Sequence, residues 1–147
     1  MTRQRKHTLN NISHYTIIEP LGRGGMGQVY KARDTRLDRI VALKLLPSQF
    51  THDERTKIRF RREAIAASKL DHPNICTIYE IDETDAGETF IAMSYCEGET
   101  LKARLARRKL DLPEAIHLWY QIALGLQSAH RSDIVHRDIK PANLIIS

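Results

Sequence analysis

The chain has 147 residues, of which 41% are hydrophobic and 28% are charged, a composition typical of a folded globular protein rather than a disordered one. No apolar run approaches the ~20 residues that a membrane-spanning helix needs, and the basic start MTRQRKHTLNN is not followed by the apolar core of a secretory signal. The net charge of +5 is partly local and the aromatic content is only 6%, which argues against a nucleic-acid interface. We therefore expect a cytoplasmic protein without a nucleic-acid partner.

The first part of the chain predicts strands. The runs 14–22 and 27–34 are rich in β-branched and aromatic residues and flank a glycine-rich turn. RIVALKLL at 39–46 predicts a third strand, and 75–82 and 89–95 form a pair around the turn DETDAGE. The sequence therefore predicts five strands before residue 96.

One helix is expected between the third and fourth strands. Thr51 and Glu54 fit a T-x-x-E capping box, and helical spacing of apolar residues continues to about Leu70. The helix must end before Pro73, because the residue that precedes a proline is disfavoured in helical conformation.

The second part of the chain predicts helices. One is expected at 100–109, and a longer one at 111–130 begins with Asp111, Pro113 and Glu114, a typical N-terminal signature. Its apolar face is regular and consists of Ala115, Leu118, Ile122, Leu126 and Ala129. A strand-rich part followed by a helical part indicates an α+β protein.

The cysteines and histidines indicate neither a metal site nor a disulfide framework. The two cysteines, Cys76 and Cys96, fit no metal-binding spacing, and the seven histidines form no HxxxH or HxH cluster. Cys76 lies in an apolar run, so we expect it to be a small buried hydrophobic residue.

The glycine-rich turn LGRGGMGQVY contains Gly22, Gly24 and Gly27 with the spacing G-x-G-x-x-G. Glycines allow the backbone to approach phosphate groups and to direct N–H groups toward them. A dinucleotide-binding oxidoreductase uses the same spacing, but there the motif opens a helix, whereas QVYKARD is typical of a strand. A flexible hairpin without ligand is the other alternative.

A lysine and a glutamate occupy apolar surroundings and predict an ion pair. Lys44 lies in an otherwise apolar strand, where an unpaired charge costs free energy. Glu63 falls on the apolar stripe of the first predicted helix, so a Glu63–Lys44 pair satisfies both groups. The alternatives are a lysine whose ammonium reaches solvent at the strand edge and a pair between Glu63 and Arg59.

The last stretch, VHRDIKPANLIIS, places polar chemistry between two apolar segments. Asp138 can accept a proton from a hydroxyl, Lys140 can stabilise developing negative charge, and Asn143 offers an oxygen to a hard cation. His136 is expected to be a packed structural residue. The stretch predicts a reaction site on a loop.

Together these motifs resemble the catalytic domain of eukaryotic-type serine/threonine protein kinases: a glycine-rich loop, V-A-L-K, a helix glutamate and H-R-D-x-K-x-x-N, in that order. LGRGGMGQVYKARD and HPNI are most similar to the bacterial branch of the family. The resemblance covers roughly residues 14–147 and implies a bilobal kinase-like fold. Its divisions are a flexible basic tail at 1–13, a β-rich N-lobe at 14–93, a hinge at 94–98 and a partial helical C-lobe at 99–147.

The resemblance implies ATP and Mg²⁺ as cofactors and a protein Ser/Thr hydroxyl as acceptor. Asp138 would be the catalytic base, Lys140 a γ-phosphate contact and Asn143 a magnesium ligand, while Lys44 would contact the α/β-phosphates and be held by Glu63. Val29 and Ala42 would enclose adenine, with Met93 behind it and the backbone of the hinge at its edge. The remaining ATP-binding positions implied are Leu21, Gly22, Arg23, Gly24, Gly25, Met26, Gly27, Ser94 and Cys96.

The family's next motif, D-F-G, does not occur in the 147 residues. We therefore expect a fragment that ends after the catalytic loop, inactive by itself, from a protein that elsewhere carries a metal-binding aspartate and possible membrane or sensor segments. A non-catalytic ATP-binding pseudokinase or scaffold protein is the alternative. We also expect the isolated chain to expose apolar surface on its long helix.

Overall fold

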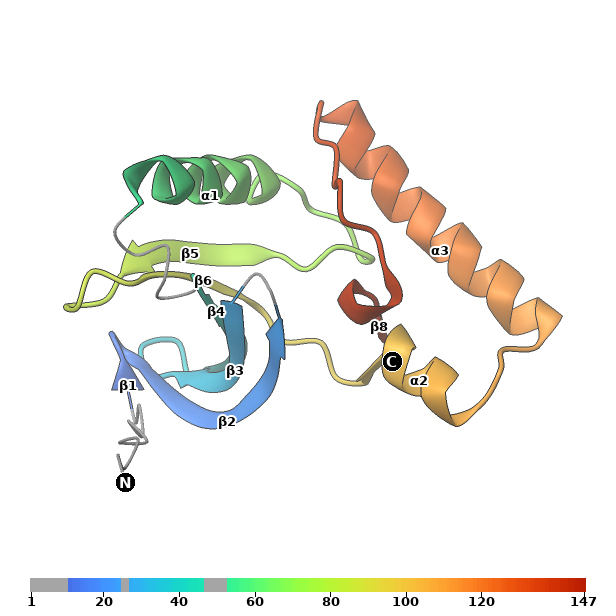
Figure 1. The fold of residues 1–147 in the computed structure, drawn as a ribbon, viewed down its shortest axis with the longest axis horizontal. Helices are drawn as coiled ribbons and strands as arrows, with labels where there is room; N and C mark the ends of the chain where they lie inside the picture. Colours follow the sequence, from blue (N-terminus) through green and yellow to red (C-terminus); the bar gives the residue numbers. More distant parts are fainter. Residues whose placement is uncertain (1–10, 25–26, 47–52) are drawn as a thin grey trace, which may run out of the picture.

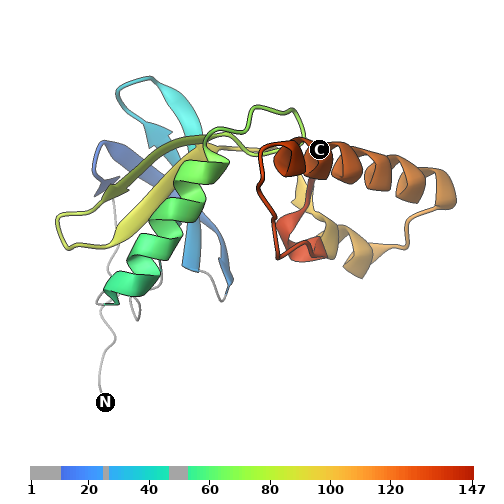
Figure 2. The ribbon, with the colours of Figure 1, turned by 90° about the horizontal axis from the view of Figure 1, so that it is seen from above.

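The computed structural model describes residues 11–24, 27–46 and 53–147. It contains a curled antiparallel sheet with one helix alongside, and a helical part that is joined to the sheet by a short connector (Figures 1 and 2). The six-stranded sheet has the order β1-β2-β3-β4-β6-β5. Its strands are β1 (Asn11–Ile12), β2 (Tyr15–Gly24), β3 (Gly27–Asp34), β4 (Arg39–Leu45), β5 (Ile78–Glu83) and β6 (Thr89–Ser94).

The five expected strands are confirmed, and β1 is an additional one. β1 contains only two residues, which pair with Tyr15 and Thr16 of β2. A pair of residues shows no alternation of apolar and polar side chains, so the sequence alone contains no signal for this strand.

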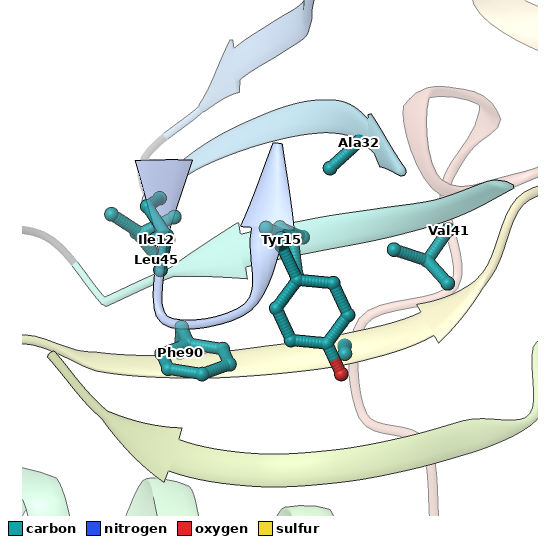
Figure 3. Close-up of a cluster of buried hydrophobic side chains, with 8 residues drawn as sticks. Ile12, Tyr15, Ala32, Val41, Leu45 and Phe90 are labelled. Atoms are coloured by element: carbon teal, nitrogen blue, oxygen red, sulfur yellow. The ribbon is translucent and has the colours of Figure 1, made fainter. Parts of the chain in front are cut away.

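Alternation along β4 separates the core of the sheet from its other face. Val41, Leu43 and Leu45 are buried in the main hydrophobic cluster, whereas Ala42 and Lys44 point to the opposite face. Figure 3 shows this cluster, which also contains Ile12, Tyr15, Ala32, Phe90 and Ala92. The rings of Tyr15 and Phe90 meet edge to face with centroids 5.9 Å apart, a favourable aromatic geometry.

The first helix, α1 (Glu54–Ala67), lies alongside β5 (Figure 1). Its N-cap is Asp53, whose side chain accepts a hydrogen bond from the backbone N–H of Arg55, so the expected cap at Thr51 is wrong in position and Thr51 itself lies outside the described residues. The helix ends at Ala67 rather than near Leu70, because the last N–H groups close tighter turns onto Ala66 and Ala67.

The helical part contains α2 (Leu101–Arg107), α3 (Leu112–Arg131), a single 3₁₀ turn η2 (Pro141–Asn143) and a small sheet of β7 (Glu99–Thr100) and β8 (Ile145–Ile146). The expected start of α3 is confirmed: Asp111 and Glu114 form a capping box. None of the helices in the described ranges is long and apolar enough to cross a membrane.

The loop between α1 and β5 connects the two parts. The side-chain amide of Asn74 donates to the backbone carbonyl and to Oε1 of Gln121 on α3, at 2.9 and 2.7 Å. Gly125 of α3 packs beside Asn74 and Ile75, where an added Cβ would lie 3.4 Å from the Asn74 carbonyl oxygen, in van der Waals contact. These contacts fix α3 relative to the sheet.

Candidate active site

Lys44 stands at the centre of the sheet face that is opposite the core. Its neighbours across the strands are Val29 on β3 and Ile91 on β6, and directly opposed residues of antiparallel strands share a face. Burial lowers the pKa of Lys44, because a low-dielectric environment disfavours the ammonium form. The sequence predicts a buried lysine, and the structure shows Lys44 half-buried in this apolar strand.

Asp138 is the centre of a hydrogen-bonded group on the loop after α3. Its Oδ1 lies 2.9 Å from Nζ of Lys140, and Nδ2 of Asn143 donates to its Oδ2 and to its carbonyl oxygen, both at 2.9 Å. The hydrogen bond from Lys140 is the largest cause that lowers the pKa of Asp138, and the bond from Asn143 adds to it. The carboxylate is therefore ionised at neutral pH and keeps acceptor capacity.

The sheet and the loop bring their charges together. The charge of Asp138 raises the pKa of Lys44 against the effect of burial, Lys140 lowers it, and Glu63 raises it. The segment that carries Asp138 runs along the side of α3 that faces the sheet (Figures 1 and 2). Four charged groups from three separate segments of the chain therefore form one electrostatic cluster.

Glu63 does not have the environment that helical periodicity predicts. It is exposed, and its neighbour Ala64 is the buried residue of α1. Among the ion pairs of the described residues, Glu63 pairs with neither Lys44 nor Arg59, so a direct Glu63–Lys44 pair is wrong for this structure. The two charges are still close enough for Glu63 to influence Lys44.

Backbone geometry holds the Asp138 loop in place. Arg137 adopts a left-handed conformation with φ 63°, which is costly for a residue other than glycine and must be compensated by surrounding contacts. The 3₁₀ turn at Pro141–Asn143 positions the Asn143 amide. Beyond it, β8 pairs with β7, and the N–H of Leu101 donates to the carbonyl of Leu144 at 2.8 Å.

His136 contacts this loop in a way that the sequence did not predict. It is exposed rather than packed, and its Nδ1 accepts a hydrogen bond from the backbone N–H of Asp138 at 3.2 Å. The imidazole therefore helps to set the direction of the backbone at Asp138.

The glycine-rich segment lies between β2 and β3, as the strand character of its flanking runs predicted. Gly24 pairs with Gly27, and Gly27 has φ 117°, a conformation that favours glycine. No atom lies within 4 Å of the position that a Cβ on Gly22 would take, so this backbone is accessible. Gly25 and Met26 lie outside the described residues, and of Arg23 only the strand position is described.

Several residues expected around adenine share the Lys44 face. Ala42 is buried and pairs with Met93 of β6, and Val29 pairs with Lys44. Leu21 is exposed near the end of β2. Ser94 is the last residue of β6, and Cys96 lies in the connector after it. The N–H of Ser94 donates to the carbonyl of Thr77 at 2.8 Å.

The two cysteines are neighbours, which their spacing did not suggest. Cys76 is exposed, so the expectation of a buried hydrophobic residue is wrong. Its Sγ lies 3.4 Å from Sγ of Cys96, although 20 positions separate the two residues. Only the fold brings them together, since the β5–β6 pairing places the loop before β5 beside the connector after β6.

Two surface hollows of the described residues lie away from this cluster. One is formed by α1 and β5, with Arg61, Ile65 and Tyr79 in its lining, and the other contains His14, Asp34 and Glu80. Neither contains Lys44 or Asp138. The candidate site is therefore defined by its converging charges rather than by the volume of a hollow.

Comparison with known proteins agrees with the motifs. The model of the protein kinase domain matches residues 15–147. The chain is 47% identical over 133 residues to serine/threonine-protein kinase PrkC of Bacillus subtilis, and 39% identical over 134 residues to PknD of Mycobacterium tuberculosis. In each comparison 90% of this chain and 20% of the relative are covered, so the chain spans about one fifth of these relatives.

Solved structures show the same architecture. The kinase domain of Mycobacterium tuberculosis PknI superposes with a TM-score of 0.83 at 31% sequence identity. The superposition covers 93% of this chain and 56% of the PknI chain. The curled sheet with its helix, the connector and the first helices of the second lobe therefore correspond to a little more than half of that kinase domain.

Proposed function

The chain belongs to the protein kinase family, and we propose that it forms the ATP-binding lobe and catalytic loop of a serine/threonine kinase. The observation that supports this most directly is the convergence of Asp138, held by Lys140 and Asn143, on the half-buried Lys44 of the sheet. The proposed reaction transfers the γ-phosphoryl group of ATP to a Ser or Thr hydroxyl of a protein. We assign the N-lobe to 14–93, the hinge to 94–98 and the partial C-lobe to 99–147.

Asp138 is assigned as the group that orients the acceptor hydroxyl and takes its proton. Its lowered pKa makes it a carboxylate at neutral pH, which is the form that accepts a hydrogen bond from a hydroxyl. Lys140 lies beside it, and its positive charge can stabilise the negative charge of the phosphoryl group during transfer. Because both are held on one short loop, the attack geometry is preorganised.

Lys44 and the glycine-rich turn are assigned to the triphosphate. Lys44 lies where burial strengthens its attraction for anions, and the accessible backbone at Gly22 can approach phosphate oxygens. Adenine is assigned to the adjoining apolar surface of Val29, Ala42 and Met93. Its edge is assigned to the backbone at Ser94 and Cys96.

Family membership implies a divalent metal ion, and we propose that this ion is Mg²⁺. The donor set fits: Nδ2 of Asn143 is directed to Asp138, which leaves the amide oxygen on the opposite side as a hard ligand. Within the described ranges no group of three or more His, Cys, Asp or Glu side chains is arranged to hold a metal by itself. When bound, Mg²⁺ neutralises phosphate charge, and Asn143 would share it with phosphate oxygens and water.

Asp138→Asn in the whole protein tests the assignment. We expect phosphoryl transfer to a generic Ser/Thr substrate, measured with labelled ATP and Mg²⁺, to fall by about 10²–10⁴-fold. Nucleotide affinity should not weaken, because the substitution removes a negative charge that faces the phosphates.

Asp133→Asn is the matched control, since Asp133 is exposed on the same loop and its positive φ of 57° suits asparagine. Unchanged transfer in Asp138→Asn would refute the role of Asp138. ATP binding without transfer by the wild-type protein would instead support a non-catalytic scaffold.

A further inference from the structure

The two free cysteines lie at the junction of the sheet, the connector and α3. Cys76 belongs to the loop before β5 and Cys96 to the connector after β6, and their sulfur atoms are 3.4 Å apart. A disulfide bond is about 2.05 Å long, so closure needs a movement of little more than an ångström. Exposure of Cys76 gives an oxidant access to the pair.

Both segments are anchored to the proposed catalytic parts. The loop that carries Cys76 is tied to α3 through the two hydrogen bonds from Asn74 to Gln121. The connector that carries Cys96 continues to Gly98, where an added Cβ would lie 2.1 Å from the Ile146 carbonyl oxygen. Gly98 therefore packs directly on β8, the strand that follows the Asp138 loop, and a shift at Cys96 cannot be absorbed there.

We propose that Cys76 and Cys96 form a reversible disulfide that ties the connector to the loop before β5 and weakens nucleotide binding. The disulfide bond follows from the contact of the sulfur atoms, whereas its effect on the affinity for nucleotide rests on the proposed function. A displacement of about an ångström in a binding segment can cost up to about a hundredfold in activity. Reversible disulfides of this kind are typical of redox sensing in reducing compartments.

The oxidant is a hydroperoxide such as hydrogen peroxide. The thiolate of Cys96 attacks one oxygen, the O–O bond breaks, and a sulfenic acid and hydroxide result. The sulfur of Cys76 then displaces the sulfenic oxygen as water, so two thiols and one peroxide give one disulfide and two waters. A dithiol reductant reverses the reaction by thiol–disulfide exchange.

The environment of Cys76 assigns the order of these steps. Although the residue as a whole is exposed, partial desolvation of its thiol and the adjacent Cys96 raise the pKa of Cys76 to about 11, while a hydrogen bond with Ser94 opposes this. Cys76 is therefore protonated at neutral pH, and we assign it as the thiol that resolves the sulfenic acid. Closure accelerates as the pH rises toward that pKa, because the resolving thiolate becomes available.

Peptide mapping of the whole protein decides whether the bond forms. No Lys or Arg lies between Leu70 and Leu101, so trypsin leaves both cysteines in one peptide, which loses two hydrogens on oxidation. Cleavage after Glu80, Glu83 and Glu88 separates the cysteines and should yield a linked pair that dithiothreitol releases. Recovery of fully alkylated Cys76 after peroxide treatment would overturn the proposal.

Nucleotide affinity decides whether the bond has the proposed effect. We expect peroxide to weaken binding of a fluorescent ATP analogue by about tenfold or more, reversibly, with Cys76→Ala and Cys96→Ser each resistant. Equal loss in these variants, or unchanged affinity in a protein shown to carry the bond, would overturn the effect. If the reduced protein binds no nucleotide, the proposed function fails, while mapping and a rise in Tm of about 5 °C on oxidation still decide the disulfide.

Discussion

At the scale of single residues, the half-buried position of Lys44 lowers the stability of the fold but favours binding of an anion. Burial lowers its pKa, and the nearby charges of Asp138 and Glu63 oppose this effect only in part. A half-buried cation that is incompletely neutralised attracts an anionic ligand more strongly than an exposed one does. In the proposed function, Lys44 therefore lowers the stability of the fold and raises the affinity for phosphate.

Lys44→Met separates these two effects. We expect nucleotide binding to lose about 1.5–3 kcal/mol, roughly ten- to a hundredfold in affinity, because a charge-assisted contact is removed. The free energy of unfolding should stay unchanged or rise, since a methionine carries no charge into the sheet. Nucleotide titration and urea unfolding of the whole protein measure the two quantities.

Lys57→Met serves as the control, because Lys57 forms an ion pair with Glu54 on α1 and is not among the charges that shift the pKa of Lys44. Loss of stability in Lys44→Met without loss of affinity would contradict the assignment. Glu63→Ala should weaken binding less than Lys44→Met does, since Glu63 is exposed and acts on Lys44 without direct contact.

At the scale of elements, the N-terminus of α3 is fixed by a cluster of three charged side chains. Asp111 caps the helix, the Glu114 carboxylate accepts a hydrogen bond from the Asp111 N–H, and Arg108 donates to both oxygens of Glu114 at 2.7 and 2.6 Å. The helix that Asn74 anchors to the sheet is therefore also fixed at its far end. This end of α3 is sensitive to pH.

Hydrogen bonds from Arg108 are the largest cause that lowers the pKa of Glu114 from 4.5 to about 2. A carboxyl group with a lowered folded-state pKa stabilises the protein fully above its unfolded pKa and loses that contribution as the pH falls. The Tm difference between the wild type and Glu114→Gln should therefore be constant above about pH 5.5 and shrink toward pH 2. Thermal unfolding across this range measures it.

The control is Asp85→Asn, a neutralisation at an exposed position of the β5–β6 turn. A Tm difference that stays constant from neutral to acid pH in Glu114→Gln would show that the Arg108–Glu114 bonds do not contribute to folding.

The elements differ in how well the sequence predicts them. The N-terminal signature at Asp111 and the strand character of 39–46 are local patterns, and the structure confirms both. The start of α1 was misplaced because Thr51 and Asp53 are both good N-caps within three residues, and the spacing favours the capping box at Thr51. Strand β1 escaped prediction because it exists only through its pairing with β2.

At the scale of the whole molecule, the candidate site was predictable in its parts but not in its geometry. Lys44 and Asp138 each stand out because their residue types are costly or reactive in their surroundings. Their electrostatic contact depends on how the connector and the Asn74–Gln121 bonds orient the two parts, which no local pattern specifies. The same holds for Glu63, whose exposure depends on the rotation of α1 about its axis, and for the contact between Cys76 and Cys96.

The outer face of α3 is apolar and exposed. Leu112, Ile116, Trp119 and Tyr120 form one stripe at helical spacing and are 60–72% exposed. The opposite face, predicted from Ala115 to Ala129, packs inward with Ala129 buried. A contiguous apolar stripe of this size is typical of an interface rather than of free surface.

A polypeptide of residues 1–147 by itself should therefore self-associate. We expect sedimentation velocity at micromolar concentration to show oligomers or aggregates, because burial of large apolar side chains contributes about 1.5–3 kcal/mol each. Ile116→Lys combined with Trp119→Glu should shift the polypeptide toward monomer. Ile58→Lys, which changes an exposed residue of α1 rather than of α3, should leave the association as it is. A wild-type polypeptide that sediments as a monomer and melts in one cooperative transition would show instead that the stripe on α3 remains exposed to water without causing association.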